Sequence, residues 1–405
     1  MGSSKTQAKF GGHAGAPFEL GINYWPRRKA MYMWREYDLA AIRDEMAQIA
    51  DMGFDTVRWF PLMQDFLPRP DFVDPQMVQR LVEVAGAVAD AGLLSVPTLL
   101  TINMSGVIWW PDWMIDAKGL YANLYSDPTV LRSQALLAET CARALAGDAS
   151  IRAFDVSNEM DEAQRPVTSD AGWLWCSMMT SAIQRGAPGV PVQIGAHLAS
   201  LDRENQMRID DIASVADEDM MHAYPLYSPA ARSFLDPELV PFSCALTAGL
   251  SGTGRATLMQ EFGLCTAPPG VAGHSFPDDF LGQPKMQYLA SEEEGGEYYR
   301  QVVERLVATG AAGAYAWCYP DYDPSLFERP PLKITVRERT FGIVRADGTE
   351  KPAADVFRGL RKRRDAGKLV RGKVPTVLDV SADEYYRTPT AHFERLYKTW
   401  TAARP

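Results

Sequence analysis

The stretch Ala153–Met160 reads AFDVSNEM, an apolar run that ends in two polar residues, Asn158 and Glu159. A short run of this kind is typical of a buried β-strand. Its polar end has two interpretations: the strand gives way to a loop, or it carries a carboxylic acid into an active site. The Asn-Glu pair alone does not decide between them, because it arises by chance about once in a chain of this length. The rest of the sequence has to decide.

Similar apolar stretches recur along the chain, and almost all are separated by segments with helical periodicity. The first such segment repeats Leu39, Ile42, Met46 and Ile49 at intervals of three and four residues. Alternating strands and helices predict parallel strands with crossover helices. Eight units over about 340 residues fit an α/β fold, the (β/α)8 TIM barrel, with enlarged βα loops. The strand candidates are Phe18–Trp25, Phe54–Phe60, Leu93–Leu100, Ile151–Asn158, Val190–Leu198, Met220–Tyr227, Thr257–Leu264 and Gly313–Pro320.

A doubly wound open sheet is the competing architecture. It usually has a glycine-rich first βα turn, whereas the first strand here ends in NYWPRR (Asn23–Arg28). We therefore expect a flexible leader at residues 1–17, a catalytic barrel at 18–365 and a C-terminal extension at 366–405 packed on the barrel. The extension is predicted to hold one strand (Val374–Val380) and one helix (Pro389–Ala402).

Composition limits the classes of partner. The chain is 46% hydrophobic and 23% charged, as expected of a globular protein, and its net charge of −10 argues against nucleic acid and anionic membranes. The five cysteines form no C-x-x-C pair, which favours reduced thiols over a zinc site. With no signal peptide or membrane-length apolar run, a cytoplasmic location is expected. The sequence gives no indication of oligomeric state.

Two carboxylates, Glu159 and Glu261, stand at the C-terminal ends of otherwise apolar strands, where barrels place their chemistry. The fourth and seventh strands lie across the barrel mouth from each other, so these carboxylates could meet. Glycoside hydrolysis needs one protonated and one ionised carboxyl group on either side of a sugar. Arg58 and Tyr224 could hold Glu261 ionised. Asn158 could contact the sugar 2-hydroxyl, and Arg58 and Asn103 are further candidates for that contact. A purely structural ion pair with Arg58 is the alternative.

With this set of residues, the sequence resembles the retaining glycosidases of glycoside hydrolase clan A, and most closely the cellulase and mannanase group of family 5. The resemblance covers about Phe18–Leu360 and includes the exit segment EKPAADVFRGL (Glu350–Leu360). It implies that Glu159 is the acid/base, Glu261 is the nucleophile, and no cofactor is used. It further implies that Trp317 lies under the sugar at the cleavage point. The motifs that carry it are Arg58, Asn158-Glu159, His222 and Tyr224 in HAY, Glu261 in QEFG, and Trp317.

The resemblance has one departure. Family 5 members often carry a histidine at the end of strand three, but TLLTINMSG (Thr98–Gly106) contains none, and Asn103 is expected to fill that space. Aromatic residues are further candidates to contact sugar: Tyr24 and Trp25 after strand one, and Trp110 in the loop IWWPDWM (Ile108–Met114). The loop tryptophans could equally fasten the loop itself.

The function expected is a retaining β-glycosidase acting on small neutral β-linked oligosaccharides or glycosides, with a β-mannoside as first choice. The tryptophan-rich loop and the long strand-seven loop (Leu264–Glu294) could close one end of the cleft, which favours exo action. The alternatives are a β-glucosidase, a β-galactosidase, a transglycosylase or an endo-acting mannanase or cellulase with the same glutamates. A carbohydrate-binding barrel without catalysis is a further alternative. A metal-dependent hydrolase is disfavoured, and no metal is expected, because the five histidines are spread out without an H-x-H motif.

Overall fold

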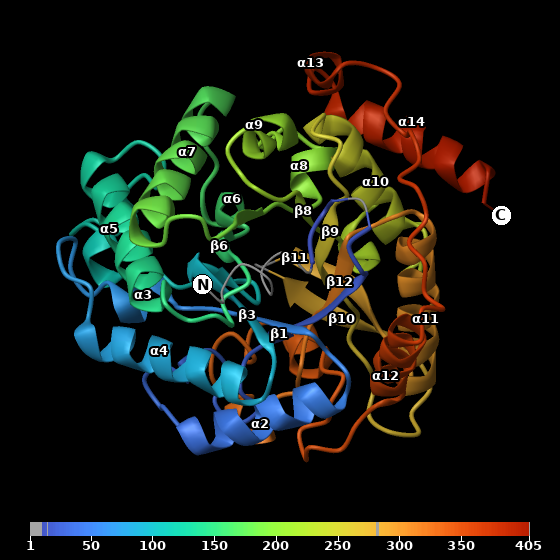
Figure 1. Cartoon of the computed structure of the whole chain (residues 1–405), viewed down its shortest axis with the longest axis horizontal. Coiled ribbons are helices and arrows are strands. Elements are labelled where there is room, and N and C mark those ends of the chain that lie inside the picture. Colours follow the sequence, from blue (N-terminus) through green and yellow to red (C-terminus); the bar gives the residue numbers. More distant parts are fainter. Residues whose placement is uncertain (1–9, 14, 281–282, 405) are drawn as a thin grey trace.

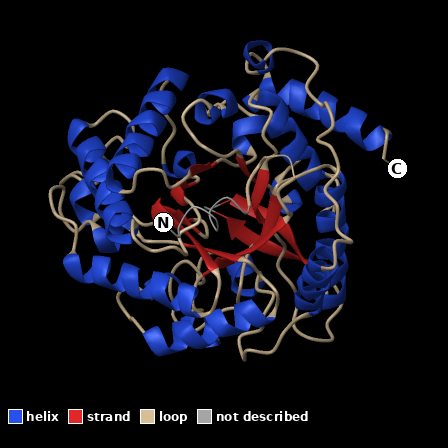
Figure 2. Cartoon of the chain, viewed as in Figure 1, coloured by secondary structure: helices blue, strands red, loops and turns tan. Residues whose placement is uncertain are grey.

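The computed structural model describes residues 10–13, 15–280 and 283–404. An eight-stranded parallel sheet stands at its centre and helices surround it (Figures 1 and 2). Neighbouring strands follow chain order, and the first strand also pairs with the last. A bridge between His197 and His222 joins the remaining two, so the predicted (β/α)8 barrel is confirmed. Its strands are β1 (Glu19–Tyr24), β2 (Thr56–Trp59), β3 (Leu94–Leu100), β6 (Phe154–Asn158), β7 (Val192–Gly195), β8 (Met220–His222), β9 (Leu258–Phe262) and β12 (Gly313–Ala316).

The helices bury their apolar faces against the sheet, as the spacing of three and four residues predicts. In the first of them Ile42, Met46 and Ile49 are buried. Asp127 caps the helix that begins at Pro128, because its side chain accepts hydrogen bonds from Thr129 N and Val130 N. Proline suits this first helical position. The outer helices are α2 (Leu39–Asp51), α4 (Pro75–Asp90), α5 (Pro128–Leu145), α7 (Ser169–Gly186), α9 (Ile209–Ala213), α10 (Leu239–Ser251), α11 (Glu292–Ala308) and α12 (Pro352–Asp365).

The loops at the C-terminal ends of the strands hold short elements of their own. The strand-seven loop forms an antiparallel hairpin of β10 (His274–Phe280) and β11 (Gln283–Leu289). The strand-three loop forms a smaller hairpin of β4 (Asn103–Met104) and β5 (Val107–Ile108). Both hairpins extend from the end of the barrel where catalytic sites lie. The short helices are α3 (Met63–Phe66), α6 (Met160–Ala163) and α8 (Ala199–Asp202), with single 3-10 turns at Ala30–Tyr32, Asp112–Met114, Pro225–Tyr227, Pro324–Leu326 and Val336–Thr340.

Polar side chains fill part of the barrel interior. Near the N-terminal ends of the strands, Arg152 pairs with Glu19, which also accepts from Thr56 and Tyr315. All four side chains are buried. A buried ion is costly unless it is paired and hydrogen-bonded. Here the carboxylate of Glu19 has both an ion-pair partner and hydrogen-bond donors, which offsets the cost of burying it.

The two ends of the chain differ from the sequence prediction in detail. Phe10 is buried and Ala256 N donates a hydrogen bond to Gly12 O (3.0 Å), so packing on the barrel begins within the segment expected to be a flexible leader. Residues 1–9 and 14 of that leader lie outside the described residues. The strand predicted at Val374–Val380 is wrong: this segment is irregular. A closed barrel offers no free edge with which another strand could pair.

The predicted C-terminal helix forms α14 (Pro389–Ala402), preceded by α13 (Ala382–Tyr385). Figure 1 shows α14 on the outside of the barrel, beside α10. Phe393, Tyr397 and Trp400 of α14 pack around Phe242 of α10, with ring centroids 5.0–5.7 Å from it. The extension is therefore part of the barrel's outer layer. Among the described residues, none of the helices combines the length and apolarity needed to cross a bilayer.

Candidate active site

A cavity of about 230 Å3 lies at the C-terminal end of the barrel. Loops after six of the eight strands contribute to it, including the small hairpin (Met104–Gly106) and the large one (Lys285 and Gln287). Glu159 and Glu261 both line it. The two carboxylates that the sequence singles out therefore share one enclosed space, at the end of the fold where barrel enzymes carry out chemistry.

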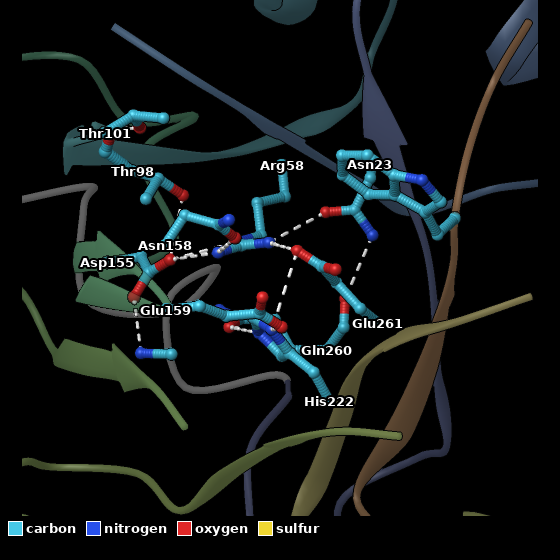
Figure 3. Close-up of polar contacts among 12 residues, drawn as sticks. Asn23, Arg58, Thr98, Thr101, Asp155, Asn158, Glu159, His222, Gln260 and Glu261 are labelled. Carbon is cyan, nitrogen blue, oxygen red and sulfur yellow. Dashed lines mark hydrogen bonds and ion pairs between the residues drawn. The ribbon is translucent and has the colours of Figure 1, made fainter. Parts of the chain in front are cut away.

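The two carboxylates are close neighbours. One oxygen of Glu159, one of Glu261 and a ring nitrogen of His222 all lie within 4.8 Å of one another. His222 Nδ1 stands between them, 2.8 Å from Glu159 Oε1 and 3.6 Å from Glu261 Oε1 (Figure 3). Retaining glycosidases hold their carboxyl groups about 5–5.5 Å apart and inverting ones about 6.5–9.5 Å. An oxygen-to-oxygen spacing within 4.8 Å lies well below the inverting range and is compatible with the retaining one.

Glu261 is held in place by two hydrogen-bond donors, one at each carboxylate oxygen. Arg58 contacts Oε1, and Tyr224 OH donates to Oε2 (2.9 Å). Arg58 is itself fixed, because its Nη2 and Nε donate to Asp155 Oδ2 at 2.7 and 2.9 Å (Figure 3). Arg58 already supplies positive charge to the carboxylate pair, so we assign no metal there. A Cβ at Gly263 would lie 2.1 Å from Trp317 O, which explains the glycine of QEFG.

Glu159 has different surroundings. Its backbone has φ 43° and ψ 51°, a left-handed conformation that ends β6 and lets α6 begin at the next residue. Non-glycine residues rarely adopt it, and such strain concentrates at functional sites. Burial by itself raises the pKa of Glu159, but the charge of His197 and the hydrogen bond to His222 outweigh burial and lower the pKa.

His197 belongs to an acidic cluster beside Glu159. Its Nε2 lies 2.6 Å from Asp161 Oδ2, which also accepts from Asn205 Nδ2 (3.0 Å). Its Nδ1 lies 3.7 Å from Glu162 Oε1. Burial alone lowers the pKa of His197, but Asp161, Glu159 and Glu162 outweigh it and raise the pKa to about 10. His197 is therefore an imidazolium at neutral pH.

Comparison with known proteins gives structural neighbours but no sequence relatives: no family model and no curated protein matches the chain. A GH5_18 enzyme from Streptomyces cattleya, solved with GlcNAc, matches with a TM-score of 0.80 and 22% identity over 96% of this chain and 92% of that one. A variant of it was solved with Manβ1-4GlcNAc. An exo-β-1,4-mannosidase from Opitutaceae bacterium strain TAV5 matches with a TM-score of 0.73 and 25% identity over 89% of this chain and 62% of that one.

The chain has the fold of the family 5 glycoside hydrolases. The resemblance drawn from Arg58, Glu159, Glu261 and Trp317 is thus confirmed at the level of the fold. The carboxylate pair stands where this fold places its chemistry, and its separation is compatible with that of retaining members.

Most of the predicted binding residues lie at the cavity. Asn103, Asn158, His222, Tyr224 and Trp317 line it. The amide of Asn158 is already engaged, since Oδ1 accepts from Arg58 Nη2 (3.0 Å) and Nδ2 donates to Asn103 O (3.1 Å). Asn103 thus lines the cavity after strand three, at the place where family 5 members often carry a histidine.

Arg58, in contrast, does not face the cavity. It is fully buried behind Glu261 and does not line the cavity. Its predicted role in binding sugar is therefore corrected: Arg58 acts through the carboxylate of Glu261, and its position in the barrel interior follows from its contact with Asp155.

Tyr24, Trp25 and Trp110, predicted to contact sugar, also do not line the cavity. Tyr24 is fully buried and its hydroxyl donates to Glu45 Oε2 (2.7 Å) in α2, because alternation along β1 turns Asn23 inward and Tyr24 outward. Trp25 is fully buried and stacks on the ring of Phe60 at 5.4 Å.

Trp110 stacks on Tyr121 at 4.5 Å within its own loop. Trp113 Nε1 donates to Leu67 O (2.8 Å). The tryptophans thus fasten this loop, which was the alternative interpretation.

Several residues of the site escaped the sequence analysis. Asp155 carries a signal that could have been used: like Glu261, it is a carboxylate in an apolar strand. Glu338 and Gln287 line the cavity but lie far beyond the ends of the barrel strands, in a 3-10 turn and on β11 of the large hairpin, so no strand end marks them. Their position at the cavity depends on how loops that are far apart in the sequence fold over the barrel.

Proposed function

We propose that the protein is a retaining exo-β-glycosidase that releases single sugars, with β-mannosides preferred, from small neutral oligosaccharides. The observation that carries the proposal is the pair Glu159 and Glu261, which share one cavity with oxygens within 4.8 Å of each other. This separation supports double displacement rather than a single inverting step.

The chemistry has two steps. The Glu261 carboxylate attacks the anomeric carbon while Glu159 gives its proton to the departing glycosidic oxygen, so a covalent glycosyl-enzyme forms and the leaving alcohol departs. Glu159 then takes a proton from water, and this water displaces Glu261 from the anomeric carbon. Arg58 and Tyr224 contact the two oxygens of Glu261 and orient the nucleophile. Glu159 must gain a proton first, which a bound sugar assists because excluding water favours the neutral carboxyl group.

Exo action is supported by the size of the cavity. Its volume of about 230 Å3 falls below the range of about 300–1,000 Å3 common for small-molecule sites. The two hairpins contribute Met104, Gln287 and Lys285 to its wall. A preference for mannose is supported by two neighbours, one solved with Manβ1-4GlcNAc and one named as an exo-β-1,4-mannosidase.

A panel of aryl β-mannosides, β-glucosides and β-galactosides, together with manno-oligosaccharides and cello-oligosaccharides, tests the proposal. The β-mannosides should be hydrolysed fastest, and the oligosaccharides should release monosaccharide from the start. An NMR time course should show the β-anomer first. Mid-chain cleavage would contradict exo action, a preference for glucosides or galactosides would contradict mannose, and the α-anomer first would contradict retention.

A further inference from the structure

The two sides of the cavity have different roles in the proposed reaction. The leaving group has to lie beside Glu159, where its oxygen receives the proton, so the sugar that is cleaved off extends past Glu261. Glu162, His197 and Arg203 line the cavity on the Glu159 side. Next to Trp317 the lining includes a polar group from three loops, formed by Tyr227, Gln287 and Glu338.

Glu338 is the central member of this group. It is 5% exposed and lines the cavity. Tyr227 OH donates to Oε1 (3.2 Å) and Trp317 Nε1 donates to Oε2 (3.4 Å). Both contacts are long, and a carboxylate has about four acceptor positions, so Glu338 keeps the capacity to accept from a ligand. Burial raises its pKa, although Arg337 opposes this.

Gln287, on β11 of the large hairpin, faces the same part of the cavity. It is 2% exposed, and its Oε1 has no hydrogen-bond partner among the described residues. Such a buried, unsatisfied acceptor destabilises the protein until a ligand supplies a donor. A hydroxyl group of a bound sugar would supply the missing donor.

The three loops are fastened to one another. Arg337, which follows β12, pairs with Asp278 of the hairpin. Its Nε also donates to Tyr227 OH (2.9 Å), in the loop after β8. The hydroxyl in turn donates to Glu338, so the carboxylate is oriented before any ligand arrives. Recognition groups held in this way bind at a low entropic cost.

We propose that Glu338 and Gln287 form the recognition site for the hydroxyl groups on the far edge of the terminal sugar, opposite the anomeric carbon. This inference rests on the proposed function and extends it. The site takes a terminal hexopyranoside with free hydroxyl groups at this edge and rejects one whose hydroxyl is substituted or missing. The exo selectivity then has a chemical basis as well as a steric one, because an extended chain would leave both acceptors without donors.

The test compares Glu338→Gln and Gln287→Ala with Glu328→Gln, a control whose side chain is 83% exposed. The substrates are the aryl β-glycoside that the wild type hydrolyses fastest and its 4-deoxy analogue. Glu338→Gln should lower kcat/KM for the parent substrate about 10- to 100-fold, as expected for a lost hydrogen bond to a charged group. It should also reduce the discrimination between parent and analogue. Gln287→Ala, which leaves the Arg337 contacts intact, should give a smaller loss in the same direction.

Unchanged kcat/KM and unchanged discrimination in both variants would overturn the inference while leaving the proposed function in place. A wild type that hydrolyses no aryl glycoside would overturn the proposed function instead. The inference then depends on calorimetric binding of methyl β-mannoside, methyl β-glucoside and methyl β-galactoside. Binding of any of these to the wild type should weaken in Glu338→Gln and Gln287→Ala but not in Glu328→Gln, and equal binding in all four proteins would contradict it.

Discussion

Glu159 and Glu261 carry the same functional group in two different surroundings. Glu261 meets a guanidinium and a phenol, which contact its two oxygens. Glu159 meets two histidines and stands on a strained turn of the backbone. Paired carboxyl groups with unequal surroundings are how one site holds both an acid and a nucleophile.

The two glutamates should therefore respond differently to removal. Glu261→Ala should abolish hydrolysis of every substrate, because no covalent intermediate can form. Glu159→Ala should lower kcat/KM for oligosaccharides about 100- to 10,000-fold, yet affect a dinitrophenyl glycoside far less, because that leaving group needs no proton. Equal losses on both substrates in both variants would contradict the assignment of roles.

His197 should affect the pH dependence of the reaction. It is charged at neutral pH and lowers the pKa of Glu159, which is also faced by His222 and Arg58. His197→Asn removes one of these positive charges, so the pKa of Glu159 rises. The basic limb of the kcat profile, which reports the pKa of Glu159 with sugar bound, should then move to higher pH, by about one unit.

The matched control is His392→Asn, on α14 outside the barrel, which should leave the profile unchanged. The profile is measured from pH 4 to 10 with an oligosaccharide, whose leaving group needs the proton from Glu159, and folding is checked by circular dichroism at each pH. A basic limb at the same pH in both variants would show that His197 does not set the proton affinity of Glu159.

At the scale of elements, the site depends on contacts between strands. Asp155 of β6 accepts from Arg58 of β2, from Thr98 of β3 and from Gly195 N of β7. Arg58 in turn reaches Glu261 of β9. One fully buried carboxylate thus ties four strands to the nucleophile.

Asp155→Ala should therefore destabilise the protein strongly. The substitution leaves Arg58 buried with only part of its charge compensated, which costs about 3–5 kcal/mol of unfolding free energy. Asp365→Ala is the control, because its side chain is 54% exposed where it pairs with Arg361 and such pairs contribute about 0–1 kcal/mol. Urea denaturation followed by tryptophan fluorescence measures both, and similar small losses would contradict the role of Asp155.

What the sequence predicts correctly is local to single elements. The barrel follows from alternating periodicities, and the placement of Glu159 and Glu261 at the barrel mouth follows from carboxylates at the ends of apolar strands. The prediction that Tyr24 contacts sugar is wrong, because the alternation along β1 that turns Asn23 into the barrel turns Tyr24 toward the helices. Glu338 lay beyond prediction, because its place in the cavity depends on loops that lie far apart in the sequence.

At the scale of the whole molecule, α14 stabilises the barrel without reaching the site. Trp400 is 4% exposed, packs 5.7 Å from Phe242 of α10, and donates from Nε1 to Glu238 Oε2 (2.8 Å). None of these residues lines the cavity. The extension should therefore contribute to stability and leave catalysis unaffected.

Trp400→Ala tests this separation. Loss of a buried tryptophan costs about 3–5 kcal/mol, so the melting temperature should fall. Below the melting transition kcat/KM should equal that of the wild type, because the barrel strands and the cavity loops keep their contacts. Trp173→Ala on α7, where the residue is 42% exposed, is the matched control and should change both quantities little. A Trp400→Ala protein that is fully folded by circular dichroism yet several-fold slower would show that α14 is coupled to the site, through α10 and the loop that follows β8.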